Sequence, residues 1–415
     1  MSKPRVIVVG GGVIGICCAY YLSKRNATVV VLERDAFGKG ASYGNAGVIA
    51  AGHPPMNKPD RVKYALTKVF DSTTPLYIAP RFDPALAAWL WRFSANCTAQ
   101  KLETNMSALA PLGHTTLELF AQLITEEELD CGYQASGYYE VYRTEQGAAH
   151  ARQDVTLMCA NGFGAAMLTG EEVGARLASL KNSVTGGVYF PDAATCDPYR
   201  FVMEVAERVR RAGGRLEVGQ AVTEVEGCAH PAVRVATGER LEADAVVLAT
   251  GAYSLQLARQ LGCRLPIQPG KGYHRDLDFG KDNAPPLEAT CVLGETSVFC
   301  TPMSGRLRLA GTMEFSGLNH RMRPSRLAQL TTAADQYLSG IGASRITSEW
   351  CGLRPCTPDG LPVVGRLPGQ TKVFAATGHA MTGLTLGPVT GSLVADLVTG
   401  ATPANDDTAL APARF

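Results

Sequence analysis

The sequence lacks a strong charge imbalance, because 39 lysines and arginines face 38 aspartates and glutamates and leave a net charge of +1. Such a chain has no global electrostatic field that would attract nucleic acid or an anionic membrane. It also has no basic stripe and no aromatic RNA-reading motif. Since 46% of the residues are hydrophobic and 19% are charged, we expect a folded, soluble protein that does not bind nucleic acid.

The sequence also lacks closely paired cysteines. Its twelve cysteines are scattered, and none of them forms a C-x-x-C pair. This excludes a recognisable zinc ribbon or redox dithiol, and no metal site is predicted. Scattered thiols are typical of a reducing compartment, so we expect a cytoplasmic protein.

No apolar stretch predicts a transmembrane span. The run from Val6 to Leu22 behind Lys3 and Arg5 resembles a signal peptide only superficially, because glycines interrupt it and no cleavage-like site of small residues follows. We interpret this run as a strand, a turn and a helix.

The first 33 residues combine these elements in a recognisable order. Arg5–Val9 and Thr28–Leu32 are β-branched runs that predict two buried parallel strands. Between them lie a G-x-G-x-x-G turn and a predicted helix over Ile16–Lys24. Glu33 closes the second strand, 18 residues after Gly15.

Each position in this turn has a physical reason. Gly10 permits the tight turn, Gly12 lets the backbone approach a pyrophosphate, and Gly15 lets the helix pack against the strand. The first helical turn, at Val13 and Ile14, offers amide groups and a positive dipole end to phosphates.

The end of the second strand completes a dinucleotide-binding pattern. Glu33, followed by Arg34, lies where a carboxylate can accept hydrogen bonds from an adenosine ribose. The order of strand, glycines, helix, strand and acid makes dinucleotide binding the preferred interpretation over a merely glycine-rich turn. This unit does not by itself distinguish NAD from FAD.

The loop that follows is rich in serine and glycine. With it, the N-terminus resembles the D-amino-acid oxidase and glycine oxidase superfamily of flavoproteins, in which such a loop runs beside the pyrophosphate toward the flavin. The resemblance implies FAD as cofactor and contacts from Ser42, Asn45, Ala46 and Gly47. Without the family, the loop is a small-residue turn.

The segment from Trp350 to Gly365 resembles the G-L-R-P…D-G-x-P-x-x-G signature of glycine oxidase and D-amino-acid dehydrogenase. In those enzymes the arginine grips the substrate carboxylate, a role that falls here to Arg354. A guanidinium presents two parallel N–H donors to a carboxylate and stays charged when partly buried. The alternative is a structural arginine paired with Asp359 or Glu349.

A turn near the C-terminus leads from a predicted strand over Val373–Ala376 into a last predicted helix over Gly387–Thr399. In the family this turn passes the flavin pyrimidine edge, where amides and a helix dipole would stabilise developing negative charge. The resemblance implies further flavin contacts at Val222, Thr250, Gly251, Gly378, Gly383, Leu384 and Thr385. His379 is a candidate contact to flavin or substrate, and a packing histidine is the alternative.

Two other residues carry open alternatives. The K-G-Y pattern ending at Tyr273 matches D-amino-acid dehydrogenases, so this tyrosine is either a wall of the substrate pocket or a core residue. Cys356 lies near the position where sarcosine oxidases attach flavin covalently. D-amino-acid dehydrogenases hold the flavin non-covalently, which is the attachment we expect.

The fold class predicted is α/β, with a Rossmann-like FAD-binding domain built on a parallel sheet and a substrate domain built on an antiparallel sheet. Aromatic-rich runs predict strands of the second sheet over 137–142, 186–190, 299–301 and 307–311. An amphipathic helix over Asp197–Ala212 and a buried strand over Ala243–Ala252 return to the first architecture. The FAD-binding domain is therefore expected to be discontinuous, over 1–55, 190–262 and 345–415, with 56–189 and 263–344 forming the substrate domain.

The resemblance implies oxidation of a small D-amino acid, of the D-alanine, D-proline or 4-hydroxy-D-proline type, to the imino acid. Electrons would pass to a respiratory quinone or an electron-transfer protein. An oxygen-using glycine or sarcosine oxidase, and a flavin-binding subunit that needs a partner, stay open. The segment over 60–106 is predicted to be largely helical, and Trp89 and Trp91 within it motivate a hypothesis of peripheral contact with the inner face of the cytoplasmic membrane.

Overall fold

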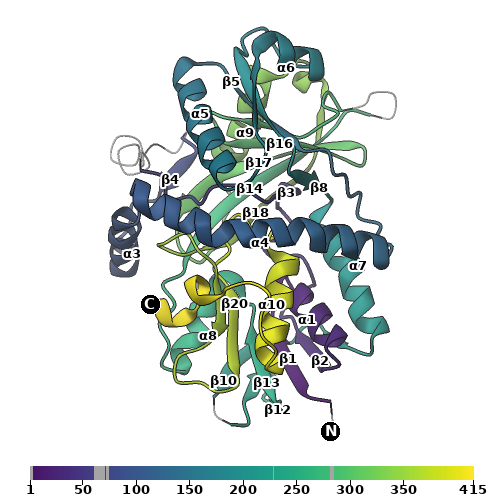
Figure 1. Cartoon of the computed structure of the whole chain (residues 1–415), viewed down its shortest axis with the longest axis vertical. Coiled ribbons are helices and arrows are strands. Elements are labelled where there is room, and N and C mark those ends of the chain that lie inside the picture. The colour runs from purple at the N-terminus through teal and green to yellow at the C-terminus, as the bar shows by residue number, and fades with distance from the viewer. Residues whose placement is uncertain (1–2, 60–70, 72–73, 228, 281–284) are drawn as a thin grey trace.

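A computed structural model of the chain describes residues 3–59, 71, 74–227, 229–280 and 285–415. Two large sheets lie one above the other, and the long helix α4 (Ala99–Glu126) crosses the molecule between them (Figure 1). Among the described residues, no helix combines the length and apolar character needed to cross a bilayer.

The lower sheet has six strands in the order β19-β20-β13-β1-β2-β9. All neighbours are parallel except β19 and β20. The strands are β1 (Arg5–Val9), β2 (Thr28–Leu32), β9 (Arg215–Glu217), β13 (Ala245–Leu248), β19 (Val363–Arg366) and β20 (Val373–Thr377).

This sheet is buried on both faces, which explains why its strands are continuous apolar runs rather than alternating ones. Val6 and Val8 pack against one set of helices, whereas Ile7 and Val9 pack against the opposite layer. The first layer contains α1 (Val13–Lys24), α7 (Pro198–Arg211) and α10 (Gly387–Thr399). The opposite layer contains a small sheet of β10 (Val222–Glu226), β11 (Ala232–Val235) and β12 (Arg240–Glu242), together with α8 (Ser254–Gln260).

The upper sheet has nine strands, with the path β18-β14-β17-β16-β15-β5-β7-β6 and β4 paired to β17. Its neighbours are antiparallel except β15 with β5 and β17 with β4. The strands are β4 (Leu76–Ile78), β5 (Tyr138–Tyr142), β6 (Ala166–Thr169), β7 (Gly186–Phe190), β14 (Gln268–Asp278), β15 (Cys291–Leu293), β16 (Val298–Met303), β17 (Arg306–Phe315) and β18 (Arg345–Cys356).

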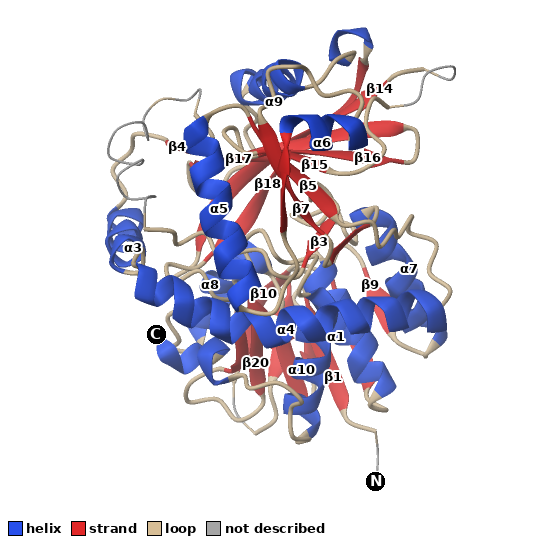
Figure 2. Cartoon of the chain, turned by 45° about the horizontal axis from the view of Figure 1, so that its top comes forward, coloured by secondary structure: helices blue, strands red, loops and turns tan. Residues whose placement is uncertain are grey.

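The remaining elements cover or connect the sheets, as the view in Figure 2 shows. They are the strand pair β3 (Val48–Ala50) and β8 (Ala193–Thr195), and the helices α3 (Pro84–Ala95), α5 (Glu145–Ala160), α6 (Gly170–Arg176) and α9 (Pro324–Tyr337). The predicted α/β class, with one largely parallel and one largely antiparallel sheet, is confirmed.

Two segments lie differently from the expected division of the chain. Strand β18 was expected in the FAD-binding part, yet it pairs along its length with β14 in the upper sheet. Helix α4 was expected in the substrate part, yet Leu112 and Phe120 pack into the core of the lower sheet with α1 and α10. Helix α4 thus packs on the helix layer that covers one face of the parallel sheet.

The segment over 60–106 is helical only in part. Residues 60–70 lie outside the described residues, Leu76–Ile78 is a strand, and α3 and the start of α4 are helices. Trp89 is buried, and its indole N–H donates to the Cys356 carbonyl at 3.1 Å. Trp91 is 73% exposed on the same helix.

Candidate active site

A cavity of about 1780 Å³ lies between the two sheets. Its wall runs from the β1–α1 turn, past the loop over 40–46, to β17 and β18 of the upper sheet. This volume exceeds the roughly 300–1,000 Å³ of an ordinary small-ligand pocket, so it has room for a large cofactor and a second molecule.

The glycine turn behaves as its spacing predicted. Gly10 has a φ of +108°, and a Cβ on it would lie 2.5 Å from the Ala249 carbonyl oxygen. A Cβ on Gly15 would lie 1.9 Å from the Gly10 oxygen, so this residue serves helix packing and does not line the cavity. Gly12, Val13 and Ile14 do line it.

The start of α1 presents amides to the cavity. The Gly11 amide donates to Glu33 Oε2 at 2.7 Å, and the Val13 amide donates to Ser42 Oγ at 2.9 Å. The amides of Gly12 and Ile14 have no acceptor in the described part of the chain. Two free amides at a helix start are what an anionic pyrophosphate requires.

The far end of this cleft contains further predicted positions. Glu33, Arg34, Val222, Thr250 and Gly251 all belong to the wall. The Arg34 guanidinium lies over the Tyr253 ring, 4.0 Å from its centroid. The Tyr253 hydroxyl is 3.0 Å from Nε2 of His320, which lies in the segment after β17 of the upper sheet. The cleft is therefore bordered by residues associated with both sheets.

A buried ion pair holds the serine- and glycine-rich loop. Arg308 on β17 donates from Nη1 to the Tyr43 and Asn45 carbonyls at 3.0 and 3.1 Å. Asp276 accepts from Arg308 Nε at 2.8 Å. Burial opposes the charge on Asp276, but the bond to Arg308 and its positive charge hold the pKa of this carboxyl below its ordinary value.

The loop itself is tightly packed. Ser42, Asn45 and Ala46 line the cavity. Gly47 does not; its φ is +80° and its carbonyl accepts from the Cys196 amide at 2.9 Å, so it sets the path of the loop. The Trp350 ring lies so close to Gly44 that a Cβ there would be 1.9 Å from it.

The turn before α10 offers a second group of amides. Those of Gly383, Leu384 and Thr385 have no acceptor among the residues that the structure describes, although Leu384 and Thr385 are buried and all three line the cavity. The Thr116 hydroxyl fixes this turn by donating to the Thr385 carbonyl at 2.6 Å. Gly378, with a φ of +78°, lies behind the wall and shapes the turn.

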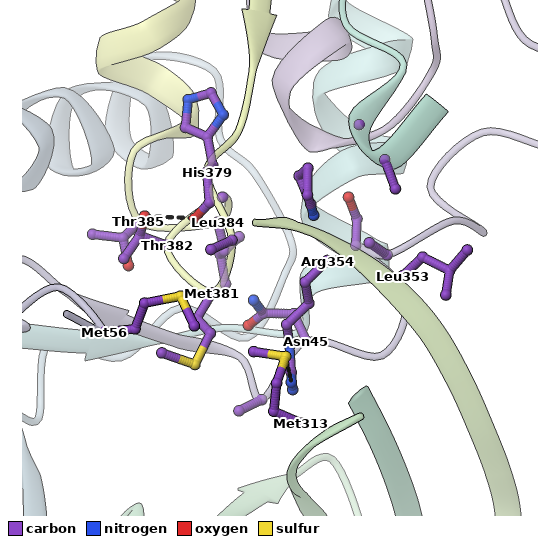
Figure 3. A pocket seen from close by; sticks show the side chains of 18 of the residues that line it. Asn45, Met56, Met313, Leu353, Arg354, His379, Met381, Thr382, Leu384 and Thr385 are labelled. Carbon is purple, nitrogen blue, oxygen red and sulfur yellow. Dashed lines mark hydrogen bonds between the residues drawn. The ribbon is translucent and has the colours of Figure 1, made fainter. Parts of the chain in front are cut away.

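His379 lies in this wall and is buried (Figure 3). Its Nε2 is 2.9 Å from Thr390 Oγ1, and its Nδ1 has no partner in the described residues. Burial lowers the pKa of His379 to about 3, so the ring is neutral at physiological pH. One nitrogen is thus a packing contact, as the alternative interpretation held, and the other is free.

Arg354 projects into the cavity from β18 (Figure 3). Its Nη1 donates to the Thr312 carbonyl at 2.6 Å, and burial lowers the pKa of its guanidinium from the ordinary value. A Cβ on Gly272 would lie 2.3 Å from its Cζ, so a glycine is needed beneath it.

The structural alternative for this arginine does not hold. Asp359 pairs with Arg414 at 2.7 Å, and Glu349 pairs with Arg275. Within the described ranges, Arg354 makes no ion pair with any acid. A half-buried cation without a counter-ion in the described residues, in the wall of a cavity, is suited to bind an anionic ligand.

Tyr273 and Cys356 do not line the cavity. The Tyr273 ring is fully buried, and its hydroxyl donates to Glu314 Oε2 at 2.8 Å, which matches the core-tyrosine alternative. The Cys356 thiol is also fully buried, and burial raises its pKa to about 12.

Several wall residues carry no motif and were missed in the sequence. Thr312 has a φ of +60°, which is unusual for a β-branched residue, and its buried hydroxyl has no partner in the described part of the chain. Met56, Met313 and Met381 also belong to the wall. These residues come from separate segments, so no pattern within one segment could have indicated that they meet.

The free amides at the start of α1 and in the turn before α10, the carboxylate of Glu33 in the wall and the volume of the cavity together fit FAD. Residues 5–397 match the family described as FAD dependent oxidoreductase. The chain belongs to this family. The predicted FAD cofactor and the assignment as a flavin-dependent oxidoreductase are confirmed; non-covalent attachment stays a prediction.

Curated relatives cover nearly the whole chain. A D-amino acid dehydrogenase of Methylobacterium radiotolerans is 34% identical over 419 residues, covering 98% of this chain and 99% of the relative. One of Vibrio atlanticus is 31% identical over 404 residues, covering 95% and 96%. Among solved structures, glycine oxidase from Geobacillus kaustophilus covers 100% of both chains with a TM-score of 0.80 at 24% identity, which shows the shared fold.

Proposed function

We propose that this chain oxidises the Cα–N bond of a D-amino acid to an imine. The observation that carries this proposal is Arg354, a half-buried guanidinium without a counter-ion in the described part of the chain, in the wall that also contains the dinucleotide turn. The D configuration is supported by the full-length relatives named D-amino acid dehydrogenase.

Different residues of the cavity wall have different roles in the proposed reaction. Bound FAD supplies the acceptor of the hydride from the substrate Cα. Arg354 binds the substrate carboxylate and fixes the direction in which Cα faces. The free amides of Gly383, Leu384 and Thr385 stabilise negative charge that develops beside them during reduction. His379, neutral at physiological pH, adds no positive charge that would repel a protonated substrate amine.

The electron acceptor is proposed to be a respiratory quinone or an electron-transfer protein, because the relatives are named dehydrogenases. An oxygen-using amine oxidase would release hydrogen peroxide with each turnover. A flavin-binding subunit would show no turnover with a dye acceptor without its partner. Dye reduction by the purified chain without stoichiometric peroxide supports the dehydrogenase.

Anaerobic bleaching of the flavin absorbance tests the activity directly. The panel contains D-alanine, D-proline, 4-hydroxy-D-proline, glycine, sarcosine and the L-enantiomers. Rapid bleaching by a D-amino acid but not by its enantiomer is expected. Bleaching only by glycine, sarcosine or L-amino acids would contradict the proposed stereochemistry while leaving the cofactor in place.

A peripheral contact with the inner face of the cytoplasmic membrane is part of the proposal for the quinone acceptor. Its support is Trp91 on α3, which is 73% exposed, and Phe82, two residues before this helix, which is 97% exposed. In a flotation experiment with vesicles of anionic phospholipid, the wild-type chain should float with the vesicles, and the Trp91→Ser variant should not. If both chains floated to the same extent, α3 would not be the membrane-binding element.

A further inference from the structure

The cavity continues beyond Arg354 into an apolar annexe. We use this name for the wall residues that pack around Met313 and Trp89, together with Met381, which lines the same cavity. Three of its side chains, Met56, Met313 and Met381, project into the cavity near Arg354 in Figure 3. The annexe comprises Met56, Leu76, Ile78, Trp89, Leu90, Phe93, Met313, Phe315 and Met381.

The annexe adjoins the carboxylate-binding position directly. Arg354 Nη1 lies 3.8 Å from the Met313 sulfur, and the same nitrogen is held by the carbonyl of the preceding residue, Thr312. A carboxylate bound by Arg354 therefore has a thioether as its neighbour. Whatever extends from the α-carbon of such a ligand on this side meets apolar atoms.

No annexe residue carries a charge, and Glu103 on α4, which also lines the cavity, is exposed to solvent. Lys58 is bound by both oxygens of Asp154 at 2.6 Å, so this pair presents no net charge. Glu140 lies on β5, three strands from β17, which carries Met313 and Phe315, and this is roughly 14 Å at the usual strand spacing. Glu33 and Arg34 belong to the dinucleotide end. A charged side chain entering the annexe would be desolvated without a partner.

The geometry points to the annexe as the binding site for the side chain of the substrate, and to substrates whose side chain is apolar and longer than a methyl group. This inference rests on the proposed function. Methionine is unbranched and polarisable, so three methionines with aromatic rings beside them accept aliphatic chains of different shape rather than one fixed ligand. We therefore expect kcat/KM to increase with the apolar surface of the side chain of the D-amino acid.

A homologous series measures this ranking. We expect kcat/KM for dye reduction to rise from D-alanine through D-2-aminobutyrate to D-norvaline and D-methionine, by roughly fourfold for each buried methylene. D-Serine should fall at least about tenfold below D-2-aminobutyrate, and D-aspartate and D-lysine further. A best rate with D-alanine or 4-hydroxy-D-proline would overturn the inference.

A charge placed in the annexe tests its location. Met56→Glu should lower kcat/KM for D-methionine at least about a hundredfold and raise it for D-lysine, while the flavin spectrum is retained. Met56→Leu should keep the wild-type ranking. Met167→Glu is the matched control, because Met167 is 37% exposed on β6 and does not line the cavity.

A second position covers the case in which Met56→Glu does not fold. Met381 is 36% exposed, so Met381→Glu tolerates the charge and should shift the ranking in the same direction. An unchanged ranking in a flavin-loaded Met381→Glu chain would overturn the inference. Failure of every D-amino acid to bleach the flavin would instead overturn the proposed function, so the two failures are distinct.

Discussion

Arg354 combines two properties that single-residue replacement can separate. It is a cation without an acid partner in the described part of the chain, and it also packs against Gly272 and the Thr312 carbonyl. Arg354→Leu should raise KM for the best D-amino acid by roughly 30-fold or more, since a carboxylate that loses its charged partner in a binding site costs about 2–5 kcal/mol. Flavin absorbance should be retained, and Arg354→Lys should restore only part of the loss.

The matched control is Arg345→Leu at the other end of the same strand. Arg345 is 80% exposed and pairs with Asp278 at the surface, so KM should not change. An unchanged KM in Arg354→Leu as well would mean that another cation holds the carboxylate.

His379 predicts an acid-side loss of stability. Burial lowers its pKa in the folded chain to about 3 from an ordinary value of 6.5, so the unfolded chain binds more protons between these two values. The contribution of this residue is therefore complete above about pH 6.5 and is lost as the pH falls toward 3, with a slope approaching about 1.4 kcal/mol per pH unit. Urea unfolding between pH 7 and pH 5 measures this slope.

Two histidine variants separate this effect from general acid denaturation. His379→Asn should reduce the pH slope, because the titrating group is gone. His114→Asn should keep it, since His114 is exposed. Equal slopes in both variants would show that His379 titrates normally in the folded chain.

At the scale of the element, α1 is placed by a close backbone approach. A Cβ on Gly15 would lie 1.9 Å from the Gly10 oxygen, so Gly15→Ala must push the start of α1 away from β1. We expect weaker FAD binding and a loss of roughly 2 kcal/mol or more of stability, as for other overpacked positions. Fluorescence titration with FAD and urea unfolding check both.

Gly40→Ala is the control for this change. Gly40 lines the cavity, unlike Gly15; it has no positive φ, and a Cβ on it would meet no other atom within 4 Å. The variant should bind FAD as the wild type does. If Gly15→Ala had the same FAD affinity and stability as Gly40→Ala, the start of α1 would be able to move away from β1 at no cost, contrary to this prediction.

Sequence patterns predicted elements well where the pattern was local. The strand Arg5–Val9 and the helix Gly387–Thr399 have the expected bounds, because apolar periodicity and glycine placement within one segment determine them. The ladder between β14 and β18 was not predicted in full. Gln268–Asp278 contains no apolar alternation, and the strand exists because a distant segment pairs with it.

The candidate site shows the same division. The predicted glycine turn and Glu33 lie within one short segment of the chain, whereas the three annexe methionines meet only through tertiary packing. The prediction that Tyr273 lines the cavity did not account for which face of the strand its side chain occupies. Side chains alternate along a strand, so Gly272 faces the Arg354 guanidinium while Tyr273 faces Glu314 on the other side. The motif K-G-Y placed the right segment at the site, but its glycine is the residue that the site uses.

At the scale of the whole molecule, the cavity joins the two sheets. Its wall includes the β1–α1 turn at one end and residues of β17 and β18 at the other, and Arg308 on β17 holds the loop that follows β2. A ligand that fills this length stabilises both halves at once. FAD should therefore stabilise the apoprotein, and its free energy of unfolding should rise by about 1.4 kcal/mol for each tenfold increase of FAD above Kd. Tm should rise with the logarithm of the FAD concentration.

The length of the ligand is the control in this experiment. ADP reaches the glycine turn and Glu33 but not the amides of Gly383 and Leu384, and FMN lacks the adenosine that would reach Glu33. Both should raise Tm less than FAD at the same concentration, because each leaves one group of polar partners unfilled. If ADP alone matched FAD, stability would come from the lower sheet only, and the upper sheet would contribute to substrate binding without being held in place by the cofactor.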